Sequence, residues 1–161
     1  MSSYYYYVNH DKKQYFSVGL VGHGVKWSCL GNTPGARALS LMLAQEGFWK
    51  NNRICTIADD KEFDRVRLEY ENIDVDATLL LFKSDGLDAY DDHLDSPGMF
   101  AMLSEIVLFV GNEDIERYLS RKHGQSWKKK YSQLIKSSPR KSWAEKLTRF
   151  QERNLAEGKH S

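Results

Sequence analysis

Two groups of carboxylates are the residues of this sequence with the clearest chemical potential. The first is Asp59 and Asp60, which follow a short apolar, β-branched segment. Functional groups gather where the strands of an open sheet end, and paired carboxylates there could hold a divalent metal for phosphoryl chemistry. The sequence Asp-Asp-Lys-Glu is also a good helix start, and nothing else in the chain completes a metal site. A helix or turn cap is therefore the preferred interpretation of this pair.

The second group is an acidic segment over residues 84–95. Calcium or magnesium accepts such oxygens, but a calcium-binding loop counted from Asp85 would have Tyr90 in place of its glycine and Ser96 in place of its final glutamate. The segment is instead predicted to be a solvated acidic loop that offers a contact surface to a protein partner. No metal and no cofactor are expected. The predicted partner-binding residues are Asp85, Asp88, Asp91, Asp92 and Asp95.

The basic residues gather near the C-terminus. Residues 117–161 hold 13 basic and 3 acidic residues, whereas residues 59–95 hold 13 acidic and 4 basic ones, so the net charge of +1 conceals a strong asymmetry. Such asymmetry concerns partners rather than fold. Lysine clusters with nearby aromatic residues can neutralise phosphates and stack on bases. The predicted nucleic-acid-binding residues of this alternative are Lys128, Lys129, Lys130, Arg140 and Lys141.

The aromatic residues among these lysines have a second interpretation. Tyr131 shares a helical face with Leu134, and Trp143 shares one with Leu147, which is typical of core packing. The lysines could then form a solvated side, or they could dock on the acidic segment of the same chain.

Nucleophilic and phosphate-binding patterns are missing from the sequence. No Ser-His-Asp or Cys-His arrangement follows from spacing, and Cys29 and Cys55 are predicted to be buried, reduced thiols. The histidines lack the spacing of metal ligands. The glycines of GLVGHG do not follow the order of a dinucleotide-binding loop, so His23 is interpreted as a polar loop residue.

The length of 161 residues fits one domain, predicted over residues 1–157 with a frayed tail over 158–161. A hydrophobic share of 41% and a charged share of 28% are ordinary for a globular protein. No run approaches the roughly 18 apolar residues of a membrane span. The N-terminus lacks a signal-peptide pattern, so we expect a cytoplasmic protein.

The first half of the chain is predicted to build a small sheet around one helix. Thr33 and Pro34 predict a helix start, with the helix ending at Gly47 and buried over most of its circumference. Strands are predicted over residues 4–9 and 14–20 as an antiparallel hairpin, over 25–30, and over 54–57 in a central position. Residues 61–64 are predicted to form a turn, and the alternation of Val66, Leu68 and Tyr70 predicts a half-exposed strand.

Helices are predicted for the rest of the chain. One spans residues 74–83, and four more span 97–110, 113–123, 127–136 and about 140–156, with all three prolines at helix starts. Ser96 and Asn112 are predicted to cap the helices over 97–110 and 113–123. The predicted fold class is α+β: a small N-terminal antiparallel or mixed sheet with one buried helix, followed by a helical C-terminal half packed on it. The residues predicted to make that packing are Phe100, Leu103, Val107 and Leu108.

Two functions are compatible with these patterns. The first is a non-enzymatic protein-binding module, such as a bacterial immunity or inhibitor protein that masks a basic partner through its acidic surface, because charge complementarity gives fast and specific association. The second is a nucleic-acid-binding protein that uses the basic helices, and it becomes a metal-dependent nuclease if Asp59 and Asp60 hold a metal.

Overall fold

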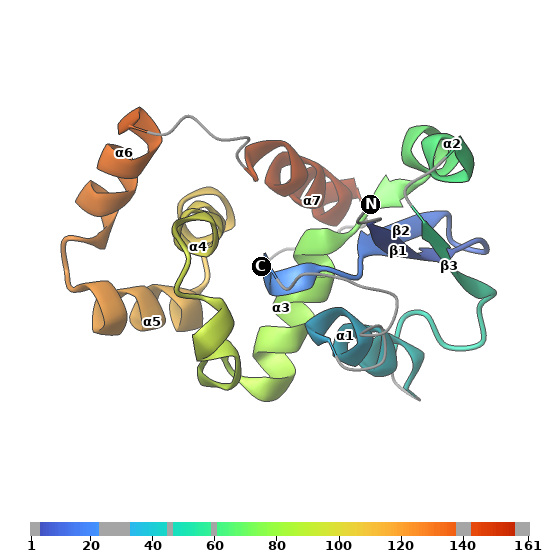
Figure 1. The fold of residues 1–161 in the computed structure, drawn as a ribbon, viewed down its shortest axis with the longest axis horizontal. Coiled ribbons are helices and arrows are strands. Elements are labelled where there is room, and N and C mark those ends of the chain that lie inside the picture. Colours follow the sequence, from blue (N-terminus) through green and yellow to red (C-terminus); the bar gives the residue numbers. More distant parts are fainter. Residues whose placement is uncertain (1–3, 23–32, 45–46, 59–60, 138–142, 157–161) are drawn as a thin grey trace. The chain divides into compact units, whose positions relative to one another are not determined.

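A computed structural model describes residues 4–22, 33–44, 47–58, 61–137 and 143–156 (Figure 1). The chain divides into two compact units, residues 1–86 (unit 1) and 87–161 (unit 2). Unit 1 contains a mixed four-stranded sheet and unit 2 is helical. The predicted α+β class is therefore confirmed. That residues 1–157 fold as one domain stays a prediction.

The sheet of unit 1 has the strand order β3-β1-β2-β4. Strands β1 (Tyr5–Asn9) and β2 (Gln14–Ser17) form the predicted antiparallel hairpin. Strand β3 (Ile54–Ala58) pairs antiparallel with β1, and the two-residue β4 (Glu71–Asn72) pairs parallel with β2. The central position predicted for β3 is wrong, because β3 lies at the edge of the sheet that the described strands form. The apolar composition of β3 is typical of a buried strand, but Ile57 is the only residue of β3 that is buried.

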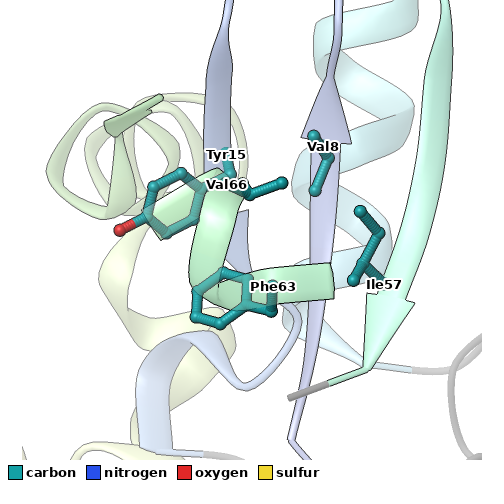
Figure 2. Close-up of a cluster of buried hydrophobic side chains, with 5 residues drawn as sticks. All are labelled: Val8, Tyr15, Ile57, Phe63 and Val66. Atoms are coloured by element: carbon teal, nitrogen blue, oxygen red, sulfur yellow. The ribbon is translucent and has the colours of Figure 1, made fainter. Parts of the chain in front are cut away.

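Helix α2 (Lys61–Glu69) covers one face of this sheet, and Figure 2 shows the buried cluster between them. Phe63 and Val66 are three residues apart and point into the cluster, which also contains Val8, Tyr15 and Ile57. The turn predicted for residues 61–64 and the strand predicted for residues 66–70 are therefore wrong. A short segment in which apolar and polar residues alternate fits a helix equally well when residues three positions apart are also apolar. Leu68, which the strand would have half-buried, is 82% exposed.

Helix α1 (Pro34–Leu43) begins as predicted, with the Thr33 hydroxyl accepting a bond from the backbone N–H of Ala36 at 3.1 Å. It ends at Leu43 rather than Gly47, and Leu43 is 40% exposed. The predicted burial over most of the circumference is therefore wrong. The buried face consists of small residues and one methionine, and a Cβ built on Gly35 would lie 2.2 Å from the carbonyl oxygen of Val18. The backbone of α1 at Gly35 therefore packs directly against the backbone of Val18.

Helix α3 (Asp74–Asp85) confirms the helix predicted over residues 74–83. Its first residue, Asp74, is buried and accepts a bond from the backbone N–H of Ser17 at 2.7 Å, which ties the helix to the end of β2. Helices α1 and α3 contact each other and lie on the sheet face opposite to α2 (Figure 1). The short helix η1 (Leu20–Gly22) contacts both. The strand predicted over residues 25–30 lies outside the described residues, as do His23 and Cys29.

Unit 2 is organised around helix α4 (Pro97–Val110), which contacts α5 (Glu113–His123), α6 (Trp127–Ser137) and α7 (Ala144–Ala156). The predicted caps are confirmed: Ser96 accepts from the N–H of Met99, and Asn112 accepts from the N–H of Ile115. Gly111 and Gly124, with φ of 76° and 80°, follow α4 and α5. Of the four α4 residues predicted to pack on the sheet, Leu108 is 46% exposed.

Two elements of unit 2 differ from the predictions. The acidic segment is not a loop, because α3 extends to Asp85 and residues Leu87–His93 form the short helix η3. Its apolar residues Leu87, Tyr90 and Leu94 are buried and fix it to the unit. Helix α7 begins at Ala144, because Trp143 is not helical, and the predicted start at residue 140 lies outside the described residues. The backbone N–H of Trp143 donates to the Glu105 carboxylate at 2.6 Å just before the helix. Pro139 lies outside the described residues.

Candidate functional site

The acidic residues around η3 are largely matched by basic residues of their own units. Asp88 pairs with Arg121, and Asp91 lies 2.9 Å from Lys122, both basic residues being in the last turn of α5. In unit 1, Arg37 of α1 donates two bonds to Asp85, at 2.9 and 3.1 Å. Three of the five predicted partner-binding acids therefore form ion pairs within the chain.

Asp91 is the centre of the pairing between η3 and α5. It accepts a bond from the buried Tyr118 hydroxyl at 2.6 Å in addition to its bond from Lys122. The Lys122 bond, together with that of Tyr118, holds the pKa of Asp91 below its ordinary value of 3.8. Burial, followed by the neighbouring Asp91 carboxylate, raises the pKa of Tyr118. These contacts make Asp91 a structural residue that fixes η3 to α5.

The remaining two acids of the segment face solvent. Asp92 and Asp95 are exposed and form no ion pair with any residue in the described part of the chain. That the five acids contact a partner stays a prediction.

The lysines of α6 differ from the paired acids Asp85, Asp88 and Asp91, because the described residues do not match them with opposite charges. Lys128, Lys129, Lys130 and Lys136 are all exposed, and the helix contains no acidic residue. Lys130 donates to the carbonyl oxygen of His123 at 3.0 Å, and Lys128 lies over the Trp127 ring, 5.6 Å from its centroid. Among the described residues, none forms an ion pair with an α6 lysine. The helix therefore presents positive charge that the described fold does not neutralise.

The outward face of α6 is a regular row. Lys129, Ser132, Gln133 and Lys136 have the i, i+3, i+4, i+7 spacing of one helix face, and all four are exposed. Trp127 on the opposite side is 2% exposed, and Tyr131 is partly buried. The aromatic residues thus belong to the packed side, as their spacing predicted, and the polar side carries the lysines. Arg140 and Lys141 lie outside the described residues.

A buried carboxylate holds α6 and α7 against α4. Glu105 is 1% exposed and accepts a bond from the Tyr131 hydroxyl at 3.0 Å as well as that of the Trp143 N–H. Burial, with the Glu105 bond, raises the pKa of Tyr131 to about 12. This residue was not singled out from the sequence. A glutamate within the otherwise apolar run of α4 is the signal that could have found it.

Three side chains of unit 1 form a second arrangement that the sequence did not reveal. The His10 ring lies with Nε2 3.1 Å from Sγ of Cys55 and with Nδ1 2.9 Å from the Tyr70 hydroxyl. No Cys-His arrangement followed from the spacing of the sequence, and this contact comes from the fold. Burial, followed by the charge of Glu62, raises the pKa of Cys55. The residues are 45 and 60 positions apart, so no local spacing could have predicted this contact.

The metal alternative gains no candidate from the described residues. Asp59 and Asp60 lie outside them, so their predicted role is untested. Among the described histidines, cysteines and carboxylates, no three come together in a group that could hold a metal ion.

Helices of sufficient length and apolarity to cross a membrane are not found in the described part of the chain. Comparisons of the sequence with protein-family models and with curated proteins, and of the fold with solved structures, give no match.

Proposed function

We propose that the protein is a non-enzymatic, cytoplasmic nucleic-acid-binding protein that contacts phosphates through the outward face of α6. The single observation that supports this function is the contrast in charge matching: the α6 lysines form no ion pair with a described residue, whereas Asp88 and Asp91 do. Lysines without an acidic partner leave a positive potential at the surface, which attracts a polyanion. Phosphate contacts supply most of the affinity of non-specific nucleic-acid binding.

The chemistry of the α6 face fits phosphates. Lysine, serine and glutamine side chains are all common donors to phosphate oxygens, and this face carries two lysines with Ser132 and Gln133 between them. With a rise of 1.5 Å per residue, Lys129 and Lys136 lie about 10 Å apart along the helix, a distance over which a strand presents more than one phosphate. The aromatic residues of α6 lie on the packed side, so binding through charge is expected and base stacking is not.

The test is the binding of a fluorescent single-stranded and double-stranded oligonucleotide, followed by anisotropy at salt concentrations between about 50 and 200 mM. We compare the wild type with K129Q/K136Q. The double variant should lose about 10- to 100-fold in affinity at the lowest salt, and the slope of log affinity against log salt should become shallower by about 2.

A matched control is K50Q/K61Q, which removes the same charge from two exposed lysines of unit 1. If this control loses as much affinity as K129Q/K136Q, the binding follows net charge and the α6 face is not the site. Failure of the wild type to bind at low salt would contradict the function itself.

A second candidate function keeps the acidic surface, as an immunity or inhibitor protein that masks a partner with a basic surface. Asp92 and Asp95, which are exposed and form no ion pair with a described residue, favour it. The Asp88–Arg121 pair is also more than half exposed on both sides, and such pairs contribute little stability, so a partner's arginine could replace Arg121. Co-purification of a basic protein by the wild type, and its loss with D92N/D95N, would support this candidate over the first.

A further inference from the structure

We propose that Cys55, His10 and Tyr70 form a thiol site at which Cys55 exchanges with small disulfides, with His10 as the base and Tyr70 as the residue that positions it. Nothing in the proposed binding function depends on this site, which lies in unit 1. A nucleophile within hydrogen-bond distance of a base, which is itself oriented by a third group, is the arrangement that activates a side chain for covalent chemistry.

Three separate elements bring the site together. His10 follows β1, and its backbone N–H donates to the carbonyl oxygen of Arg53 at 3.0 Å, which fixes it beside the start of β3. Cys55 is paired with Val8 in the register of β1 and β3. His10 is two residues after Val8, so the side chains of Val8 and His10 lie on the same face of the sheet. Tyr70 follows α2 and donates its N–H to the carbonyl oxygen of Val66 at 2.8 Å. The sheet register and the end of α2 therefore set the geometry.

The two bonds of the imidazole define its role. When Nδ1–H donates to the Tyr70 oxygen, Nε2 carries the lone pair and accepts the thiol proton of Cys55. The rings of His10 and Tyr70 are also in edge contact, with centroids 5.7 Å apart and planes at 80°. Tyr70 thus holds the orientation of the imidazole, and in the proposed site His10 has the tautomer that carries its proton on Nδ1.

The exchange reaction balances without a further reagent. His10 Nε2 takes the proton of the Cys55 thiol, and the thiolate attacks one sulfur of the small disulfide. The disulfide's S–S bond breaks as the Cys55–sulfur bond forms, and the leaving thiolate takes the proton back from His10. Cys55 ends as a mixed disulfide, and the departing half of the reagent is reduced to a thiol.

A base is needed because the thiol is neutral at rest. Burial and the negative charge of Glu62 on α2 both raise the pKa of Cys55, so few molecules carry a thiolate without help. Besides Glu62 and Tyr70, Asp11 in the turn of the hairpin interacts with the charge of His10. Cys55 is only partly buried and packs against the edge of the buried cluster, so a small disulfide is the reagent expected to reach its sulfur.

The experiment measures the reaction of the folded protein with dithiodipyridine by the absorbance of the released thiopyridone. A Cys29→Ser background leaves Cys55 as the remaining thiol of the sequence. At neutral pH, adding His10→Gln should slow the reaction about tenfold or more, since a positioned base contributes at least that much to proton transfer. Tyr70→Phe, which keeps the ring and loses the hydroxyl, should give an intermediate rate.

The pH profile separates a base from a merely structural neighbour. At strongly alkaline pH the thiol ionises by itself, so the rates of the parent and of His10→Gln should converge. Unfolding would expose Cys55 and make it react faster, so a slower His10→Gln variant cannot be explained by misfolding. A His10→Gln rate equal to or above that of its parent at neutral pH, or a parent that does not react, would overturn the proposal.

Discussion

The two charged regions of unit 2, η3 and α6, carry opposite charges and differ in whether their charged side chains form ion pairs within the described part of the chain. In η3, Asp88 and Asp91 meet Arg121 and Lys122 of α5, and the buried Tyr118 hydroxyl adds a third bond. In α6, the lysines meet no acid within the described part of the chain. Asp91 is fixed by two bonds to α5, whereas the exposed Asp88–Arg121 pair contributes little stability, and the lysines of α6 have no ion-pair partner among the described residues. The comparison therefore separates structural charges from candidate binding charges.

The largest expected effect comes from the contact that holds α6 in place. Replacing Glu105 by alanine leaves the Tyr131 hydroxyl and the Trp143 N–H without their acceptor in a buried site. We expect a loss of about 3 kcal/mol in the free energy of unfolding, measured by urea denaturation.

The control is Glu145→Ala on α7, an exposed glutamate whose partner Arg149 is also exposed. It should change the stability little, because exposed i, i+4 pairs are weak. Equal losses in the two variants would mean that Glu105 does not hold α6 and α7, and the lysine face would then lack a fixed platform.

A smaller effect tests the difference between matched and unmatched charges directly. Tyr118→Phe removes one bond to Asp91 while it keeps the buried ring, and it should cost about 1 kcal/mol. K129Q/K136Q should change the free energy of unfolding by less than about 0.5 kcal/mol, as exposed substitutions do. Chemical denaturation of both variants checks the pair of values. A destabilised lysine variant would show that those lysines are structural after all.

The smallest effect is a pH dependence at the border between α5 and α6. Burial and the charge of Lys130 lower the pKa of His123 below its ordinary value of 6.5, while Asp95 opposes this shift. The unfolded chain therefore binds the proton at a higher pH than the folded one, and stability falls as the pH decreases through 6.5. Lys130→Gln should reduce that loss, which denaturation midpoints above and below this pH would reveal. An unchanged or larger loss in Lys130→Gln would contradict this origin.

The helix caps were predictable from the sequence because they depend on a few adjacent residues. Thr33, Ser96 and Asn112 each cap a helix through a bond to a backbone N–H three residues later. The separation of packed and polar sides in α6 was likewise visible in the spacing of Tyr131 and Leu134. Local chemistry of this kind is independent of the rest of the fold.

The errors and omissions concern contacts between distant residues. Helix α2 was mistaken for a turn and a strand because the burial of Phe63 and Val66 depends on the sheet that they cover. The pairing of Asp91 with Tyr118 joins residues 27 positions apart, and that of His10 with Cys55 joins residues 45 apart. Such contacts depend on strand register and helix packing, which alternation and propensity do not specify.

The close approach of Gly35 to Val18 has a consequence for how unit 1 can change during evolution. Any side chain at position 35 would have to occupy the space of a backbone carbonyl, and backbone cannot move aside as a flexible side chain can. Gly86, Gly111 and Gly124 differ, since space is open around them and only their backbone conformation favours glycine. A library of all substitutions, selected for folded protein, should therefore return glycine alone at position 35 and tolerate asparagine at the other three.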